Sequence, residues 1–139
     1  MAQDRSIFIT QFDFDRLTKV IKTYSPQNDF DQENIERLIY DLERATILDS
    51  KDIPANVVTM NSKVYLRDVD SRQETIFTLV FPQDADMAEN KISVLAPVGS
   101  AVLGYKAGDT IEWKVPARIK RLKIESVIYQ PEAAGNYHL

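Results

Sequence analysis

The sequence predicts an α+β fold, in which a short helical hairpin precedes a module of strands curled around one short helix. Apolar residues first recur at intervals of three and four, as on one face of a helix, and from Asn56 onward at intervals of two, as in half-buried strands. The charge divides at the same place. Residues 1–53 hold 11 acids and 7 bases, which leaves 10 of each among the rest from totals of 21 and 17. We therefore expect two units, residues 1–52 and residues 53–139.

Two apolar stripes at helical spacing build the first unit. Asp13 is a candidate N-cap of the first helix because its carboxylate can accept unsatisfied amides, and Ser25-Pro26 ends that helix. Asp29 or Asp31 could cap the second helix, with Glu33 near its positive end. The helices, about 18 and 26 Å long, form an antiparallel hairpin (a short coiled coil) whose base rests on the second unit. The stripes are Phe14, Leu17, Val20, Ile21, Tyr24 and Ile35, Leu38, Ile39, Leu42, Ala45.

The second unit alternates strand candidates with turns. We expect four or five antiparallel strands around a short helix from Pro97 to Gly104, with the proline in its first turn and the glycine at its stop. Asp70-Ser71 and Ala107-Gly108-Asp109 are the clearest turn signals. The strand candidates are centred on Val64 and Leu66, Glu74 to Phe81, Lys91 to Leu95, Ile111 to Val115, and Ile119 to Tyr129.

Composition excludes several classes of protein. With 139 residues, 44% of them hydrophobic, the chain has the size and content of one globular domain, or of one domain with an appendage. The absence of cysteine rules out disulfides, a thiolate nucleophile and Cys-ligated metals. No apolar run is long enough to span a membrane and the N-terminus is no signal peptide, so we expect a cytoplasmic protein. A net charge of −4 argues against a general nucleic-acid binder.

Motifs for catalysis or cofactors are missing. His138 is the only histidine and lies next to the last residue, which is an unfavourable place for a base or a ligand. The four glycines form no phosphate-binding loop, and Gly99 and Gly104 are explained by packing or capping of the short helix. We therefore expect no catalytic residue, no metal and no cofactor.

Two charged clusters have alternative interpretations. Asp29, Asp31 and Glu33 lie beside Phe30 at the hairpin tip, where they favour a helix N-terminus but could also hold Mg²⁺. The bases from Arg118 to Lys123 alternate with aliphatic residues. They indicate a solvated strand face, or else a contact with nucleic acid or an acidic protein.

The run from Ile92 to Gly104, followed by Gly108-Asp109 and a strand ending in Pro116, resembles the C-terminal domain of the Gre transcript-cleavage factors. It is still more similar to the Rnk family, the regulators of nucleoside diphosphate kinase. That family has a similar opening at Val57 to Ser62 and a similar ending at Tyr129 to Gly135. The resemblance covers about residues 53–139, and the hairpin in layout.

The resemblance implies an FKBP-like module and a partner, RNA polymerase. The segment Leu95, Ala96 and Pro97 resembles the loop with which Gre factors dock on the rim of the polymerase secondary channel. Gre factors usually have polar residues where this chain has Leu95 and Ala96, so the contacts are expected to differ. Docking there would also place the chain near nucleic acid inside the transcription complex. We expect the chain to act as a monomer.

The hairpin differs from that of Gre factors, whose longer coiled coil presents an Asp and a Glu three residues apart to hold the catalytic Mg²⁺. Glu33-Asn34 matches the end of that pattern, but Phe30 stands where the Asp belongs, and the nearest acids are Asp29 and Asp31. Metal ligands must be placed closely, and short helices do not reach deep into a channel. The sequence therefore predicts a non-enzymatic regulator that occupies the channel entrance and competes with Gre factors without stimulating cleavage.

Two alternatives remain open at this point. The chain could be a genuine Gre-like cleavage and elongation factor that uses its acidic tip. It could instead be a peptidyl-prolyl isomerase, by analogy of fold alone. An isomerase needs a deep aromatic pocket, which Val102 and Leu103 would exclude if they fill the concavity of the sheet.

Overall fold

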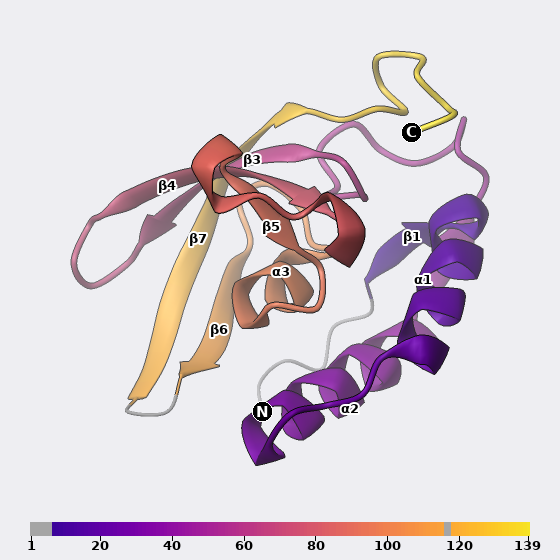
Figure 1. Ribbon diagram of the computed structural model, residues 1–139. Coiled ribbons are helices and arrows are strands. Elements are labelled where there is room, and N and C mark those ends of the chain that lie inside the picture. The colour runs from indigo at the N-terminus through magenta and orange to yellow at the C-terminus, as the bar shows by residue number, and fades with distance from the viewer. Residues whose placement is uncertain (1–6, 116–117) are drawn as a thin grey trace.

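The computed structural model describes residues 7–115 and 118–139 and has the expected mixed α+β architecture (Figure 1). Two helices lie beside a sheet, and a third, short helix packs against the sheet itself. In chain order the elements are β1 (Phe8–Thr10), α1 (Gln11–Thr23), α2 (Asp29–Glu43), β2 (Thr46–Leu48), β3 (Lys63–Asp68), β4 (Glu74–Val80), the 3₁₀ turns η1 (Pro82–Asp84) and η2 (Met87–Glu89), β5 (Lys91–Ser93), α3 (Pro97–Val102), β6 (Thr110–Val115) and β7 (Arg118–Tyr129).

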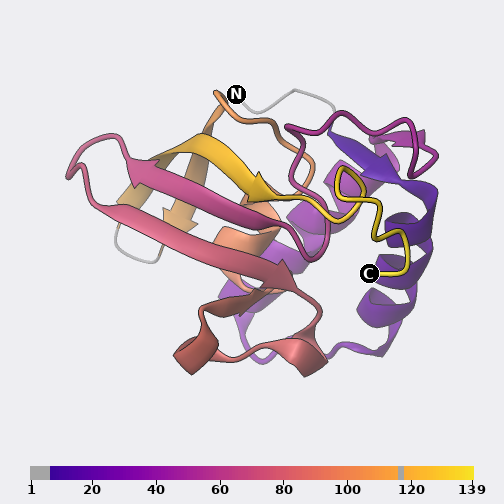
Figure 2. The same cartoon turned by 90° about the horizontal axis from the view of Figure 1, so that it is seen from above.

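The main sheet has five strands in the order β5-β4-β3-β7-β6, seen from above in Figure 2. The long strand β7 lies between β3 and β6 and pairs antiparallel with both. The prediction of a wholly antiparallel sheet is wrong at one edge, because β5 pairs parallel with β4. Residues 81–90, which contain η1 and η2, connect the two strands. They bring the chain back alongside β4 as far as Thr78, so that β5 runs in the same direction as β4.

Helix α3 lies close to the sheet edge because Gly99 has no side chain. A Cβ built there would lie 2.2 Å from the carbonyl oxygen of Ser93 in β5. Pro97 occupies the first turn, as expected, and the chain leaves the helix through Gly104, which has φ +84°. The predicted short helix with its proline start and glycine stop is confirmed.

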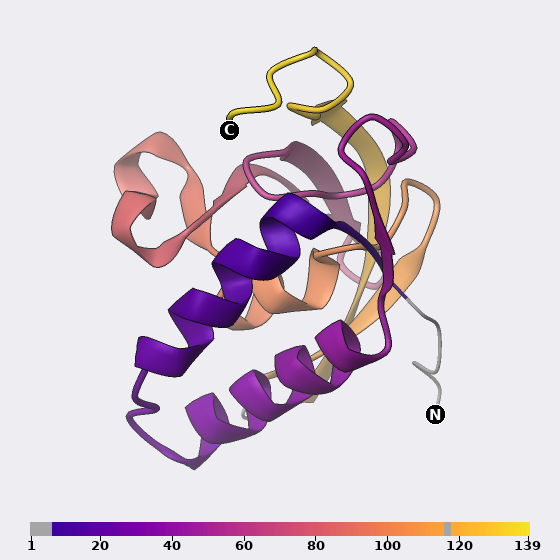
Figure 3. The same ribbon diagram turned by 90° about the vertical axis from the view of Figure 1, so that its right-hand side faces the viewer.

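Helices α1 and α2 run antiparallel and lie across one side of the sheet module (Figure 3). Their predicted caps are wrong. The Thr10 hydroxyl accepts from the amide of Asp13, and the Asn28 side chain accepts from the amide of Asp31. Asp13 and Asp31 therefore stand at the third helical position and Asp29 at the first. A carboxylate there interacts favourably with the helix dipole but is not the N-cap.

A two-stranded parallel sheet, which the sequence analysis did not predict, joins the two ends of the hairpin. Strand β1 leads into α1, β2 follows α2, and the two pair from Phe8↔Thr46 to Thr10↔Leu48. The same segment contacts the module at Gly104, whose carbonyl accepts from the amide of Phe8 at 3.1 Å. The expectation that the base of the hairpin rests on the second unit is confirmed.

A buried carboxylate fixes α1 on the module. The Asp13 side chain is fully buried, and its Oδ2 accepts from the backbone amide of Met60 at 3.0 Å. Its Oδ1 accepts from Arg16 Nη2 at 2.5 Å. Burial raises the pKa of Asp13 to about 6, against the opposing effect of these two donors. We call this arrangement of Asp13, Arg16 and Met60 the Asp13 joint.

The C-terminal segment lies beside α1 (Figure 2) and contacts the Asp13 joint through Arg16. Arg16 donates to the main-chain oxygen of Leu139 at 2.8 Å, and its guanidinium lies over the rings of Phe12 and Phe81. The buried Glu132 accepts from the Thr59 hydroxyl at 2.7 Å. A continuous core joins both parts of the chain, since Leu17 and Leu38 belong to the same buried cluster as Phe77 of β4 and Ile124 of β7.

Replacing Gly104 with alanine should destabilise the protein. The new Cβ would lie 2.5 Å from Cβ of Ile7, in addition to the strain of a positive φ, so we expect a loss of about 2 kcal/mol or more in urea unfolding. Gly108→Ala is the matched control, because Gly108 also has a positive φ but has no neighbour within 4 Å of the added Cβ. Equal losses for the two variants would contradict the close approach of Ile7.

The Asp13 joint predicts a pH dependence of stability. Between about pH 4 and pH 6 the folded protein keeps a proton on Asp13 that the unfolded chain has released. Its contribution to the free energy of unfolding therefore falls as the pH rises, by on the order of 3 kcal/mol. Asp13→Asn cannot titrate and should lose this slope. Urea unfolding of both proteins from pH 4 to pH 7 measures it, and parallel pH profiles would show that Asp13 titrates normally.

Candidate functional site

The predicted docking segment connects β5 to α3. Its backbone is fixed at the start, because the amide of Leu95 donates to Oγ of Ser93 and the amide of Ala96 to the carbonyl of Ser93. The Leu95 side chain is buried, with 9% exposed, whereas Ala96 and Pro97 are half-buried. The segment therefore leaves Ala96 and Pro97 partly accessible to solvent, while Leu95 belongs to the core.

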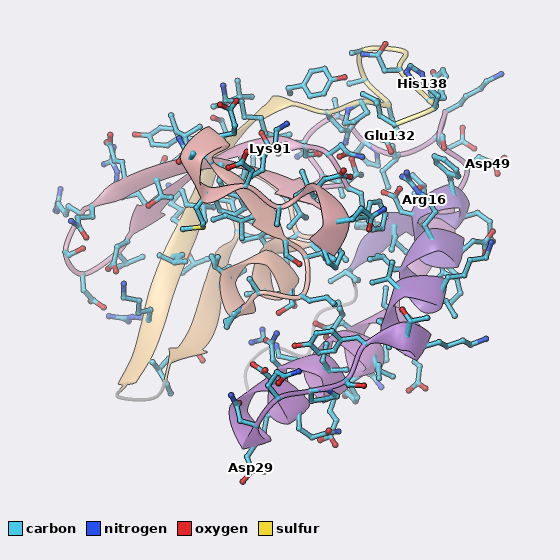
Figure 4. The ribbon with its side chains drawn as sticks, viewed as in Figure 1. Arg16, Asp29, Asp49, Lys91, Glu132 and His138 are labelled. Atoms are coloured by element: carbon cyan, nitrogen blue, oxygen red, sulfur yellow. The ribbon has the colours of Figure 1, made fainter. Side chains whose placement is uncertain are left out.

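The predicted acidic tip separates into two kinds of carboxylate. Asp29 and Glu33 are exposed, and Figure 4 shows Asp29 at the end of the molecule opposite Arg16 and Glu132. Asp31 is half-buried and structural: it accepts from the amide of Gln27 at 3.2 Å and from the Tyr24 hydroxyl at 3.4 Å. The side chain of Phe30 lies outside the part of the chain that the structure describes.

Asn34 connects the hairpin to the docking segment, and the sequence analysis gave it no structural role. Its Nδ2 donates to the carbonyl of Leu95 at 2.9 Å, and its Oδ1 accepts from the Ser100 hydroxyl at 2.8 Å. We call these three residues the Asn34 latch. An asparagine one turn inside an amphipathic helix gives no signal of a partner more than sixty residues away.

Arg37 extends this attachment along α2. Its guanidinium donates to the carbonyl of Glu112 in β6 at 3.3 Å, one helical turn beyond Asn34. Burial raises the pKa of Asp41 above its ordinary value, although Arg37 opposes the shift. Helix α2 therefore lies against α3 and the β6 edge of the sheet, and does not project away from the module.

These contacts bring the tip and the docking segment to the same end of the molecule. Asp29 stands five positions before Asn34, so the tip extends only about 7.5 Å along the helix axis beyond the Asn34 latch. A partner that covers Ala96 and Pro97 meets the first turns of α2 beside them.

The basic run on β7 is largely paired. Arg121 lies 2.8 Å from a carboxylate oxygen of Asp70, and Lys120 lies 3.9 Å from one of Asp68. The side chain of Arg118 lies outside the described residues. This arrangement favours the interpretation as a solvated strand face over that of a nucleic-acid contact.

Several cavities lie outside the tip and the docking segment, among them one of about 290 Å³ between α1 and α2. Another, of about 430 Å³, lies beside the Asp13 joint and is lined by Arg16, Lys19, Asn61 and His138 among others. A third, of about 230 Å³, lies between the sheet and α3 with the buried Phe77 in its wall. Val102 and Leu103, which were expected to fill the concavity of the sheet, are buried, but they do not fill this cavity. Within residues 7–115 and 118–139 no cluster of three or more acidic or histidine side chains could hold a metal ion, and no helix could cross a bilayer.

Comparisons with known proteins agree with this architecture. The family model for the C-terminal domain of the transcription elongation factors GreA/GreB matches residues 53–129. The chain is 40% identical over 100 residues to the regulator of nucleoside diphosphate kinase of Escherichia coli, with 71% of this chain and 74% of that protein covered. It is 40% identical over 101 residues to transcription elongation factor GreA of Chloroherpeton thalassium, with 70% of this chain and 64% of that protein covered.

A solved structure extends the likeness to the hairpin. The transcription elongation factor GreA/GreB from Nitrosomonas europaea is 41% identical and superposes with a TM-score of 0.74, over 91% of this chain and all of that one. The match therefore includes helices α1 and α2 as well as the sheet module. Together with the family model, which covers more than half of the sequence, it shows that this chain belongs to the GreA/GreB family of transcription elongation factors.

Proposed function

We propose that this chain is a non-enzymatic regulator of transcription that binds RNA polymerase at the rim of the secondary channel. It competes there with Gre-type factors and does not stimulate transcript cleavage. Family membership and the likeness to a regulator of nucleoside diphosphate kinase support the general role. The observation that carries the finer proposal is the attachment of α2 to α3 through Asn34, because the tip extends only about 7.5 Å along the helix axis beyond that residue.

In this proposal residues 53–139 form an FKBP-like docking module, and residues 1–52 form a short antiparallel hairpin fastened to it. Ala96 and Pro97 contact the rim, and Leu95 supports them from the core. The tip residues Asp29, Phe30, Asp31 and Glu33 modulate the binding. The chain acts as a monomer in the cytoplasm.

The docking segment is tested by binding to core RNA polymerase, with and without an excess of a Gre factor. We expect the Gre factor to displace the chain. Pro97→Ala should weaken binding about tenfold, because it makes the loop more flexible and reduces the contact surface. Pro82→Ala is the matched control: Pro82 also opens a short helical turn and is half-buried, but it belongs to η1 and not to the docking segment. Equal affinities of the wild type and Pro97→Ala would count against this surface.

The alternative, a Gre-like cleavage cofactor, has one observation in its favour. Asp29 and Glu33 are both exposed and four residues apart, so they share one face of α2. In a Gre factor such a tip must reach the polymerase active centre to help hold Mg²⁺. Here the Asn34 latch holds the second turn of α2 beside the docking segment.

Transcript cleavage in a backtracked polymerase complex separates the two functions. We expect RNA cleavage at the intrinsic rate when this chain is added, because its acids stay near the rim, while a Gre factor added in parallel accelerates it. The chain should also slow the cleavage that a limiting Gre factor stimulates. Faster cleavage with the chain alone, abolished by Glu33→Gln, would establish the alternative.

A further inference from the structure

The Asn34 latch joins the hairpin to both sides of the docking segment with a single side chain. The amide nitrogen of Asn34 donates to the carbonyl of Leu95, before the segment enters α3. The amide oxygen accepts from the hydroxyl of Ser100, one turn inside α3. The two bonds are 2.9 and 2.8 Å long and use one donor and the acceptor of the side-chain amide.

The docking segment has few internal restraints of its own. Ala96 is the N-cap residue of α3 and makes no side-chain capping bond, and α3 is only six residues long. So short a helix is not stable by itself in water. The shape of Leu95–Pro97 therefore depends on partners outside the segment. Ser93 holds its start, Asn34 holds the carbonyl of Leu95, and Ser100 lies within hydrogen-bond distance of the carbonyls of Ala96 and Pro97.

We propose that Asn34 is a positioning residue for docking: it holds Leu95–Pro97 and the start of α3 in the shape that the partner binds. This inference rests on the proposed function for its partner, a protein surface at the polymerase channel rim. The hairpin then contributes to binding through the conformation of the loop, apart from any contact that its tip makes. Pre-organising a loop raises affinity because less conformational entropy is lost on association.

The burial of these residues indicates that Asn34 positions the docking segment and does not hide it from a partner. With the Asn34 latch closed, Ala96 and Pro97 are already half-exposed, whereas the Leu95 side chain belongs to the core cluster. If the Asn34 latch opened, Leu95 would be uncovered and the loop would become mobile, but no ordered binding surface would be gained. The latch also contains no charged group, so its effect on affinity should not vary with salt, unlike that of Asp29 and Glu33.

The test compares Asn34→Ala with Gln32→Ala, an exposed amide on the same helix whose side chain, among the described residues, bonds to Glu36 and not to the sheet module. In the protein alone, we expect amide hydrogen exchange at Ser100 and Leu103 to become about tenfold faster in Asn34→Ala and to stay unchanged in the control. Binding to core polymerase should weaken about five- to tenfold in Asn34→Ala, equally at low and high salt. Circular dichroism confirms that both variants fold.

A second variant distinguishes the latch from a general loss of helix contacts. Ser100→Ala removes the hydroxyl that bonds to Asn34 and that also lies 3.1 Å from the carbonyl of Pro97. It should have an intermediate effect by itself, and the double variant should lose less than the sum of the two single variants. The proposal is overturned if the losses of the two single variants add in the double variant. It is also overturned if Asn34→Ala leaves amide exchange unchanged, or if it binds polymerase as tightly as the wild type or more tightly. If the wild-type chain fails to bind polymerase, the proposed function falls and the docking role with it. The exchange data then still decide whether Asn34 fixes the loop.

Discussion

The orientation of the hairpin depends on the buried carboxylate of Asp13. Removing an ionised carboxylate from water costs several kcal/mol, and the amide of Met60 and the guanidinium of Arg16 offset part of this cost. Arg16 lies on α1 itself, whereas the bond to Met60 needs α1 in one position relative to the turn at residues 59–62. Since Arg16 also contacts Phe81 and the main chain of Leu139, the same constraint positions the C-terminal segment.

Two polar attachments at opposite ends of the hairpin make it part of one body with the module. The Asp13 joint fixes the base, where β1 and β2 pair, and the Asn34 latch fixes the distal part of α2. Between them the apolar faces of both helices pack into the core that continues through the sheet. A hairpin held in this way lies against the side of the sheet module and does not project from it, which is the physical basis for proposing a rim-bound regulator.

The spacing of apolar residues, prolines and glycines predicted most of the helices and strands. It could not predict polar contacts between residues that are far apart in the sequence. The apolar spacing of Leu17 and Leu38 predicted the helices, and the glycine at position 104 predicted the helix stop. Asp13 was mistaken for a cap because an acid favours the first turn at several positions. Its actual partner, Met60, is 47 residues away. The docking segment was predicted from a family resemblance, but the contact of Asn34 with Leu95 follows from tertiary packing alone.

The C-terminal cover of the Asp13 joint has a consequence for folding during synthesis. Arg16 bonds to a residue 123 positions later, and Thr59 to one 73 positions later. At about 5–20 residues per second, a ribosome needs roughly 6–25 s to make the segment between Arg16 and Leu139. During that interval the nascent hairpin carries an uncovered apolar stripe, so this is the stage at which the chain is most open to chaperones and to aggregation.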